Sequence, residues 1–303
     1  MSKRYAIFCS GQGAQHATMF GLTEQEPVQI LPDWGDEKLH EILVDPAALF
    51  ANHNAQPMII AVGLTRWQAL RPHLPTPSLI AGYSVGELTA YGVAGALDDA
   101  TLIALAEQRA AAMNRCVHDG QPHAMMAVGG LLVAQILPIL QAHDLSIAIQ
   151  NHRDRIVVGG LVADCTAAEI SLTARGAVCQ RLPVTVASHT PLMHEAVAHF
   201  GAALGRCNWA PMSAPVLAGV DAQKIRTAPR AIAALQAQLT ATIHWQDCMD
   251  ACVENGVEVV LELGPGNALS RMMGERYPEV ACRSVDEFRR VGAVVDWLLR
   301  HVG

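Results

Sequence analysis

Apolar and polar positions in the first part of the chain fall into two periods that predict alternating strands and helices. Residues 5–9 and 78–81 are short apolar runs of strand length, and each leads into a glycine turn. Residues 85–94 follow the second run with the pattern of a helix, so a strand, a sharp turn and a helix meet at Ser84. Helical spacing of apolar residues also predicts helices over residues 56–70 and 99–115.

Residues 21–56 carry little periodic pattern and are predicted to be irregular. Pro27, Pro32 and the polar residues 52–54 mark turns there, and one short helix is expected near residues 37–43. This segment is the least defined part of the predicted fold.

The middle of the chain has a pattern of its own, with short elements in the order strand, helix, strand, strand, helix, strand. This is the order of the ferredoxin-like unit. We therefore predict a small inserted domain over residues 124–187. Its elements are expected at residues 125–128, 133–142, 146–150, 155–158, 163–175 and 178–184.

Strands and helices alternate again after the insertion, up to a strongly apolar strand over residues 257–263 that ends in a Gly-Pro-Gly turn. Alternation on both sides of the insertion favours one α/β domain built from two separated segments. The predicted fold class is therefore α/β. A large α/β-hydrolase-like domain with a parallel sheet, formed by residues 1–123 and 188–303, carries the ferredoxin-like βαββαβ small domain.

Composition narrows the classes of partner. Of 303 residues, 51% are hydrophobic and 16% are charged, which predicts a folded chain with a sizeable core. The net charge of -7 and the lack of a basic run argue against a nucleic-acid surface, and no apolar stretch reaches the roughly 20 residues of a membrane span. Eight scattered cysteines without a CxxC pair are typical of reduced thiols, so a cytoplasmic protein is expected.

The sharpest candidate for chemistry is the sequence Gly-Tyr-Ser-Val-Gly at residues 82–86, which matches GxSxG between a predicted strand and a predicted helix. This is the pattern of a nucleophile elbow, whose tight turn exposes the Ser84 hydroxyl. The main-chain N–H of Val85, at the start of the helix, is placed to bind an oxyanion. The alternative is a tight turn in which the serine only caps the helix.

A serine nucleophile needs a base, and His189 is the candidate because it follows the point where the chain returns from the small domain to the large one. Clefts form at such junctions. The alternative for His189 is a capping or core histidine. His194 and His199 follow at steps of five, which turns them off a shared helix face, so no metal site is expected.

Two further features were weighed as binding sites. Arg109 lies on or beside the apolar stripe of the helix over residues 99–115. A charged side chain at such a position needs a binding partner or access to solvent. Arg109 either serves the site or reaches out to solvent or an ion-pair partner. Gly11 and Gly13 resemble a dinucleotide loop, but His16 stands where the third glycine belongs, which excludes that site.

Five motifs in this order resemble the malonyl-CoA:acyl carrier protein transacylase family. They are GQGxQ after the first strand, GxSxGE, an arginine twenty-five residues beyond the serine, SHxxLM after the insertion, and GPG after an apolar strand. The resemblance extends over nearly the whole chain and is weakest over residues 21–56. Members of this family move a malonyl group from coenzyme A to the phosphopantetheine thiol of a carrier protein.

The resemblance implies a role for each candidate residue. Ser84 would take the malonyl group as an ester, and His189 would act as its general base and then as general acid. Gln12 and Val85 would donate main-chain N–H groups to the oxyanion. Arg109 would hold the free carboxylate of the malonyl group through two parallel hydrogen bonds.

The family also implies the surroundings of the site. The imidazole is oriented by a main-chain carbonyl from the segment ahead of a tryptophan, which here falls at His244. Malonyl-CoA would be the substrate and an acyl carrier protein the partner, with no bound cofactor and no metal. The small domain would cover the site and shape the entrance for the pantetheine arms.

Some residues depart from the common family pattern. Relatives in fatty acid synthesis have Phe-Pro ahead of GQG and His before the nucleophile, whereas this chain has Cys9, Ser10 and Tyr83. These features resemble the acyltransferase (epsilon) subunit of malonate decarboxylase, so the carrier subunit of that enzyme is the expected partner. The alternatives are a transacylase of fatty acid or polyketide synthesis, a serine thioesterase or hydrolase, and an inactive carrier-docking subunit.

Overall fold

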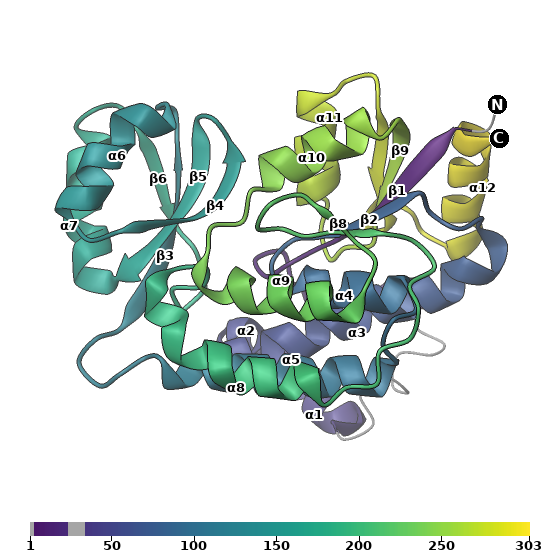
Figure 1. Cartoon of the computed structure of the whole chain (residues 1–303), viewed down its shortest axis with the longest axis horizontal. Coiled ribbons are helices and arrows are strands. Elements are labelled where there is room, and N and C mark those ends of the chain that lie inside the picture. Colours follow the sequence, from purple (N-terminus) through teal and green to yellow (C-terminus); the bar gives the residue numbers. More distant parts are fainter. Residues whose placement is uncertain (1–2, 24–33) are drawn as a thin grey trace.

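The computed structural model describes residues 3–23 and 34–303, and it contains a large and a small sheet that lie side by side (Figure 1). The turns expected at Pro27 and Pro32 lie outside the described residues. No helix within the described ranges combines the length and the apolar character needed to cross a membrane.

The large sheet has six strands, in the order β10 (Ala281–Ser284), β9 (Val257–Glu262), β1 (Arg4–Cys9), β2 (Leu79–Gly82), β7 (Val216–Leu217) and β8 (Lys224–Ile225). All neighbouring pairs are parallel except β7 and β8. The central strand β1 pairs with β2 on one side and with β9 on the other, so segments distant in the sequence meet there. Helices cover both faces, which is why these strands are almost continuously apolar.

Helices pack on the two faces of the large sheet, with α10 and α11 on one side and α3, α4, α5, α8 and α9 on the other (Figure 1). The C-terminal helix α12 contacts β9 and α3. The helices are α1 (Gly35–Val44), α2 (Pro46–Phe50), α3 (Asn52–Leu70), α4 (Gly86–Val93), α5 (Asp99–Arg115), α8 (His194–Gly205), α9 (Ala228–Thr240), α10 (Trp245–Glu254), α11 (Ala268–Arg276) and α12 (Val291–Val302).

The small sheet is antiparallel and has a hydrophobic core of its own. Its strand order, β4-β5-β3-β6, and the order of its elements along the chain are those of the ferredoxin-like unit. The two chain crossings into this unit lie together, because the N–H of Ala187 donates to Nδ1 of His123 at 3.3 Å. Its elements are β3 (His123–Gly129), α6 (Val133–Ala142), β4 (Ser146–His152), β5 (Arg155–Leu161), α7 (Val162–Thr173) and β6 (Val178–Arg181).

The structure confirms the predicted fold class. The segment between residues 34 and 56 contains the short helix expected near residues 37–43, which is α1, but it is largely helical rather than irregular. α1 and α2 occupy most of it, and α3 begins at Asn52. The polar residues assigned to a turn instead fix the first turn of α3. Asn54 Nδ2 donates to the main-chain oxygen of Ala48 at 3.0 Å, and Asn52 Nδ2 donates to Asn114 Oδ1 at 2.8 Å.

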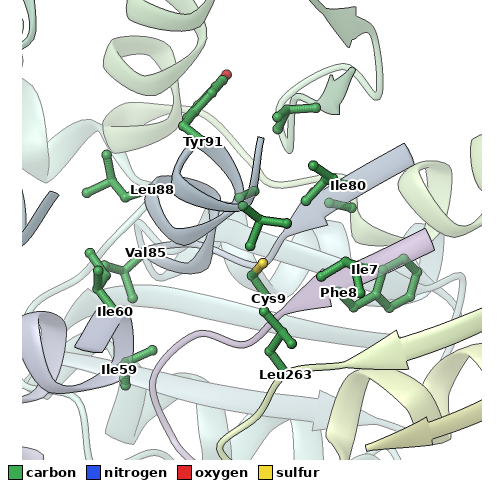
Figure 2. Packing of buried hydrophobic residues seen from close by; sticks show 14 of the residues in the cluster. Ile7, Phe8, Cys9, Ile59, Ile60, Ile80, Val85, Leu88, Tyr91 and Leu263 are labelled. Atoms are coloured by element: carbon green, nitrogen blue, oxygen red, sulfur yellow. The ribbon is translucent and has the colours of Figure 1, made fainter. Parts of the chain in front are cut away.

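The hydrophobic core extends to the start of α4, next to the end of β1. Figure 2 shows Val85 and Leu88 on the same side of the view as Ile59 and Ile60 of α3, with Cys9 at the end of β1 to their right. All five side chains are buried. This packing holds the turn between β2 and α4 on both sides, so the residue at the tip of the turn has a fixed position.

Candidate active site

Ser84 lies in the turn between β2 and α4, where its backbone adopts the left-handed conformation with a φ of 56°. The motif glycines permit this turn. A Cβ at Gly86 would lie 2.2 Å from the carbonyl oxygen of Cys9. A Cβ at Gly82 would lie 2.3 Å from the main-chain nitrogen of Glu87. The strand, the turn and the helix therefore meet as the GxSxG spacing predicts, with Ser84 at the tip.

His189 lies against Ser84, with 2.8 Å between Ser84 Oγ and His189 Nε2. The other ring nitrogen, Nδ1, lies 2.5 Å from the main-chain oxygen of Gln238. That contact requires a proton on Nδ1, which leaves the Nε2 lone pair facing the serine hydroxyl. Burial, and then the charge of Arg109, lower the pKa of His189 to about 3, so the ring is neutral near pH 7 and able to accept a proton.

The carbonyl that orients this imidazole belongs to Gln238, and the expectation that His244 makes the contact is wrong. The main-chain oxygen of His244 accepts the N–H of Cys248 in the first turn of α10, at 3.1 Å, and its N–H donates to Gly219 at 2.7 Å. Gln238 instead lies in the last turn of α9, where carbonyl groups lack partners within the helix. One of these carbonyls therefore serves His189.

The two residues expected to bind an oxyanion reach Ser84 from different directions. Gln12 lines the same pocket as the serine. Its loop packs directly on the elbow, since a Cβ at Gly11 would lie 2.5 Å from the carbonyl oxygen of Tyr83. Val85 follows the serine at the start of α4, where main-chain N–H groups have no partner within the helix. Both residues thus lie close to Ser84 in the fold.

A pocket of about 70 Å³ opens at Ser84 and His189. The glycine loop and the elbow form one side of it. The small sheet, with the segment that leaves it, supplies an apolar wall on the other side, and such a wall limits the access of water. The apolar residues in this wall are Met125, Ile149, Val157, Leu182 and Val184.

Arg109 is buried on α5, with 1% of its surface exposed, and lies next to the pocket rather than in its lining. Its Nη1 donates to Gln56 Oε1 at 2.8 Å and its Nη2 donates to Gln238 Oε1 at 3.1 Å. Burial lowers the pKa of Arg109 to about 10, against an opposing effect of Glu87, so the guanidinium stays charged at neutral pH. This burial excludes the alternative of a side chain that reaches to solvent.

Glu87 is a buried carboxyl group directly behind the elbow. Its Oε2 accepts the side-chain N–H of Gln238 at 2.7 Å and the main-chain N–H of Gly219 at 3.1 Å, and its Oε1 accepts the hydroxyl of Tyr91 at 3.4 Å. Burial raises the pKa of Glu87 to about 7, although these hydrogen bonds and the charge of Arg109 oppose the rise.

The acyl transferase domain family matches residues 7–290 of this chain. The chain belongs to the acyl transferase family. It is similar to a malonyl CoA-acyl carrier protein transacylase of Synechocystis sp., with 28% identity over 80% of this chain and 81% of the relative. The transacylase of the same name from Mycobacterium bovis is 30% identical over 76% of this chain and 77% of the relative.

Solved structures agree with this assignment. FabD from Acinetobacter baumannii is 26% identical and superposes with a TM-score of 0.89, covering 99% of each chain. A malonyl-transacylase in complex with its holo type II polyketide synthase acyl-carrier protein is also 26% identical, with a TM-score of 0.88 over 97% of this chain and 99% of that chain. The fold of the acyl transferase is therefore that of both structures.

Three buried polar residues of this acyl transferase site received no role in the sequence analysis: Gln56, Gln238 and Glu87, the last of which is the glutamate of the GxSxGE motif. For Gln56 a signal was present, because α3 is buried on all sides and a polar residue in such a helix needs a partner. Glu87 directly follows the glycine that ends the GxSxG motif, on the buried side of α4. Gln238 carries no comparable signal, because glutamine is common on the partly exposed helices of which α9 is one.

Proposed function

We propose that this acyl transferase moves a malonyl group from malonyl-CoA to the phosphopantetheine thiol of an acyl carrier protein, through an ester on Ser84. The observation that carries the proposal is the 2.8 Å contact between Ser84 Oγ and His189 Nε2. The buried, charged Arg109 nearby suits an acyl group that carries an acid. The names of the relatives support the same substrate and the same kind of partner.

In the first step, Nε2 of His189 takes the hydroxyl proton of Ser84 while Oγ attacks the thioester carbonyl of malonyl-CoA. The carbonyl oxygen becomes an oxyanion that accepts the main-chain N–H groups of Gln12 and Val85. The C–S bond then breaks, and the leaving coenzyme A sulfur receives the proton from His189. The products are free coenzyme A and a malonyl ester of Ser84.

In the second step, the thiol of the carrier's phosphopantetheine gives its proton to Nε2 of His189 and attacks the ester carbonyl. The same two N–H groups bind the second oxyanion. The ester C–O bond breaks, the proton returns to Oγ of Ser84, and the carrier leaves with the malonyl thioester. The apolar wall from the small sheet favours this thiol over water as the second nucleophile.

Arg109 selects the acyl group in this proposal. Its guanidinium holds the free carboxylate of malonyl, and hydrogen bonds between charged partners contribute about 1.5–3 kcal/mol each. An acetyl group has no acid and would leave the cation with neutral partners only. The enzyme is therefore selective for malonyl over neutral acyl groups.

The proposed carrier is an acyl carrier protein of fatty acid or polyketide synthesis rather than the carrier subunit of malonate decarboxylase. The relatives and the solved complex with a polyketide carrier favour this alternative. The residues that suggested the decarboxylase have structural roles. Ser10 Oγ donates to Glu262 Oε1 at 2.8 Å, and the hydroxyl of Tyr83 donates to Asn151 Oδ1 at 3.0 Å. Transfer assays with both carriers decide between them.

The proposal predicts a covalent adduct. Brief exposure of the protein to malonyl-CoA without a carrier adds one malonyl group to Ser84, detected by intact and peptide mass spectrometry, and Ser84→Ala abolishes the adduct. An adduct that survives Ser84→Ala moves the nucleophile elsewhere. A protein that gains no adduct at all is an inactive docking subunit, and rapid release of free malonate without a carrier identifies a hydrolase.

The role of Arg109 predicts a change in acyl selectivity. Arg109→Ala lowers kcat/KM for malonyl transfer by at least about 10²-fold, which corresponds to roughly 2.7 kcal/mol of lost transition-state binding. The kcat/KM for acetyl transfer from acetyl-CoA stays the same or rises, because the acetyl group has no carboxylate to bind the guanidinium. Both rates are measured by release of coenzyme A. An equal fall for both acyl groups would show that Arg109 serves the fold instead.

A further inference from the structure

Arg109 is a buried cation whose hydrogen-bond acceptors are both neutral. The partners of its two terminal nitrogens are the amide oxygens of Gln56 and Gln238, and Nε has no hydrogen-bond partner in the part of the chain that the structure describes. Among the described residues no carboxylate lies within the 4.0 Å of an ion pair with Arg109. The equally buried Arg66, by contrast, is paired with the carboxylate of Asp286.

Each of the two amides is oriented by a partner at its far end. Gln56 Nε2 donates to Asn52 Oδ1 at 2.7 Å, so that Gln56 Oε1 faces the guanidinium. Gln238 Nε2 donates to Glu87 Oε2 at 2.7 Å, so that Gln238 Oε1 does the same. Asn52 and Glu87 therefore set the orientation of the two amides without contacting the guanidinium themselves, and both residues are buried.

This arrangement has an electrostatic consequence. A buried arginine is normally paired with a carboxylate, and such a pair is strong in the low dielectric of a protein interior. Amide oxygens accept hydrogen bonds from the guanidinium and fix its position, yet leave its charge uncompensated at contact distance. An incoming carboxylate therefore meets no carboxylate of the described residues in contact with the cation, because Glu87, whose charge affects the pKa of Arg109, lies behind Gln238.

We propose that Gln56 and Gln238 determine acyl selectivity, as neutral positioning residues that hold Arg109 in place while keeping its charge available to the carboxylate of the substrate. The proposal rests on the function proposed above, because it assumes that Arg109 receives the malonyl acid. It adds that selectivity depends on the neutrality of the two amides, and not only on the presence of the cation.

The test is Gln56→Glu, which keeps the length and shape of the side chain and places a carboxylate on Nη1 of Arg109. Gln56 is the better position of the two, because a carboxylate at Gln238 would also face Glu87. The expected result is a fall of at least about 10²-fold in kcat/KM for malonyl-CoA, with kcat/KM for acetyl-CoA within about threefold of the unchanged protein. Both are measured as acylation of Ser84.

Two control variants separate charge from shape and location. Gln108→Glu makes the same change beside Arg109 in the sequence, but on an exposed side chain, and leaves both acyl donors unaffected. Gln56→Met removes the acceptor without adding charge. It lowers kcat/KM for malonyl-CoA but keeps the malonyl-to-acetyl ratio within about tenfold of the unchanged protein, because the cation stays available.

Three outcomes overturn the proposal. These are an equal loss of kcat/KM for both donors in Gln56→Glu, no loss for either donor in that variant, and a fall of the malonyl-to-acetyl ratio in Gln56→Met as large as in Gln56→Glu. If Gln56→Glu does not fold, Gln238→Glu supplies the carboxylate instead and must lower the same ratio, since its main-chain oxygen still orients His189. Failure of the unchanged protein to accept malonyl-CoA would be a different result, which refutes the proposed function itself.

Discussion

Gln238 joins three ionisable groups of the site through one residue. Its main-chain oxygen contacts His189, its side-chain oxygen accepts from Arg109 and its side-chain nitrogen donates to Glu87. Burial lowers the pKa of the His189 imidazole and raises the pKa of the Glu87 carboxyl group, so both groups are shifted toward their neutral forms. Their effects on stability therefore have opposite signs with pH.

Glu87 gives a prediction for stability against pH. Its pKa is about 7 in the folded protein and 4.5 in a model peptide, so between these values the folded state binds more protons and stability falls as pH rises. The loss is on the order of 3 kcal/mol once the pH exceeds both values. Glu87→Gln removes this loss, so its stability relative to the unchanged protein improves from pH 4.5 to pH 8 in denaturant titrations.

The control for this prediction is Glu254→Gln, which makes the same change on an exposed side chain at the end of α10 and reports the effect of the substitution without burial. Parallel curves for Glu87→Gln and the unchanged protein would mean that Glu87 is charged across the whole range. The quantity to compare is the change in the stability difference with pH, because the substitution also changes contacts that do not depend on pH.

The sequence predicted those candidate residues that can be recognised by their residue type and their spacing. Ser84 stands in a motif, and Arg109 stands out because a charge on an apolar stripe is rare. The main-chain oxygen that contacts His189 was predicted at His244 but belongs to Gln238, six residues earlier. Residue type gives no signal for this contact, because every residue has a main-chain carbonyl. Which carbonyl is free depends on where α9 ends, and helix ends are the least predictable feature of a sequence.

The elbow between β2 and α4 depends on close contact with the end of β1. Gly86 approaches the carbonyl oxygen of Cys9 so closely that no side chain fits between them. Figure 2 shows Val85 and Cys9 within the same packed core. The main chain at Cys9 and at Gly86 cannot move apart to make room, because the first is held in the sheet and the second in the helix.

Gly86→Ala is therefore expected to destabilise the protein and to displace Ser84. Overpacking of this kind costs about 1–3 kcal/mol or more, measured by thermal or denaturant unfolding. The rate of malonyl-Ser84 formation falls with it. The matched control is Gly274→Ala in α11, where a Cβ meets nothing within 4 Å and alanine should stabilise the helix by roughly 0.5–1 kcal/mol. Equal stability of the two variants would contradict the structural role of Gly86.

Periodicity predicted most elements because their apolar faces are regular. The six elements of the small unit and the strands β1, β2 and β9 lie close to the predicted residues. The helix expected near residues 37–43 corresponds to α1, whereas α2 was missed because prolines and short polar runs mark turns as often as helix starts. In this chain Pro46 stands at the start of α2, where its missing N–H costs nothing.

The small unit is joined to the large one by main-chain hydrogen bonds along β4. The N–H of Ile243 donates to Ala148 at 2.9 Å, and the N–H of Gln150 donates to Ile243 at 2.8 Å. Thr242 Oγ1 adds a bond to the main-chain oxygen of Ile147 at 2.7 Å. The segment ahead of Trp245 therefore serves to dock the small sheet over the pocket. No sequence pattern revealed this, because a contact between distant segments leaves no local trace.

This junction predicts how water is kept from the acyl-enzyme. Thr242→Val removes one hydrogen bond worth about 1 kcal/mol and loosens the cover over the pocket. Hydrolysis of the malonyl ester relative to transfer should rise several-fold, as measured by release of free malonate with and without carrier. Thr65→Val loses a similar bond, to Ala61 within α3, and should leave that ratio unchanged. A common effect of both variants would assign the change to global stability.

Both members of the proposed catalytic pair have a left-handed backbone conformation, with φ at 56° for Ser84 and 61° for His189. Side chains that branch at Cβ are strongly disfavoured in this region. Threonine offers a hydroxyl as good as that of serine, yet it cannot occupy the elbow without unwinding it, whereas cysteine can. The shape of the main chain, more than the reactivity of the functional group, thus restricts which nucleophiles this architecture could ever have recruited.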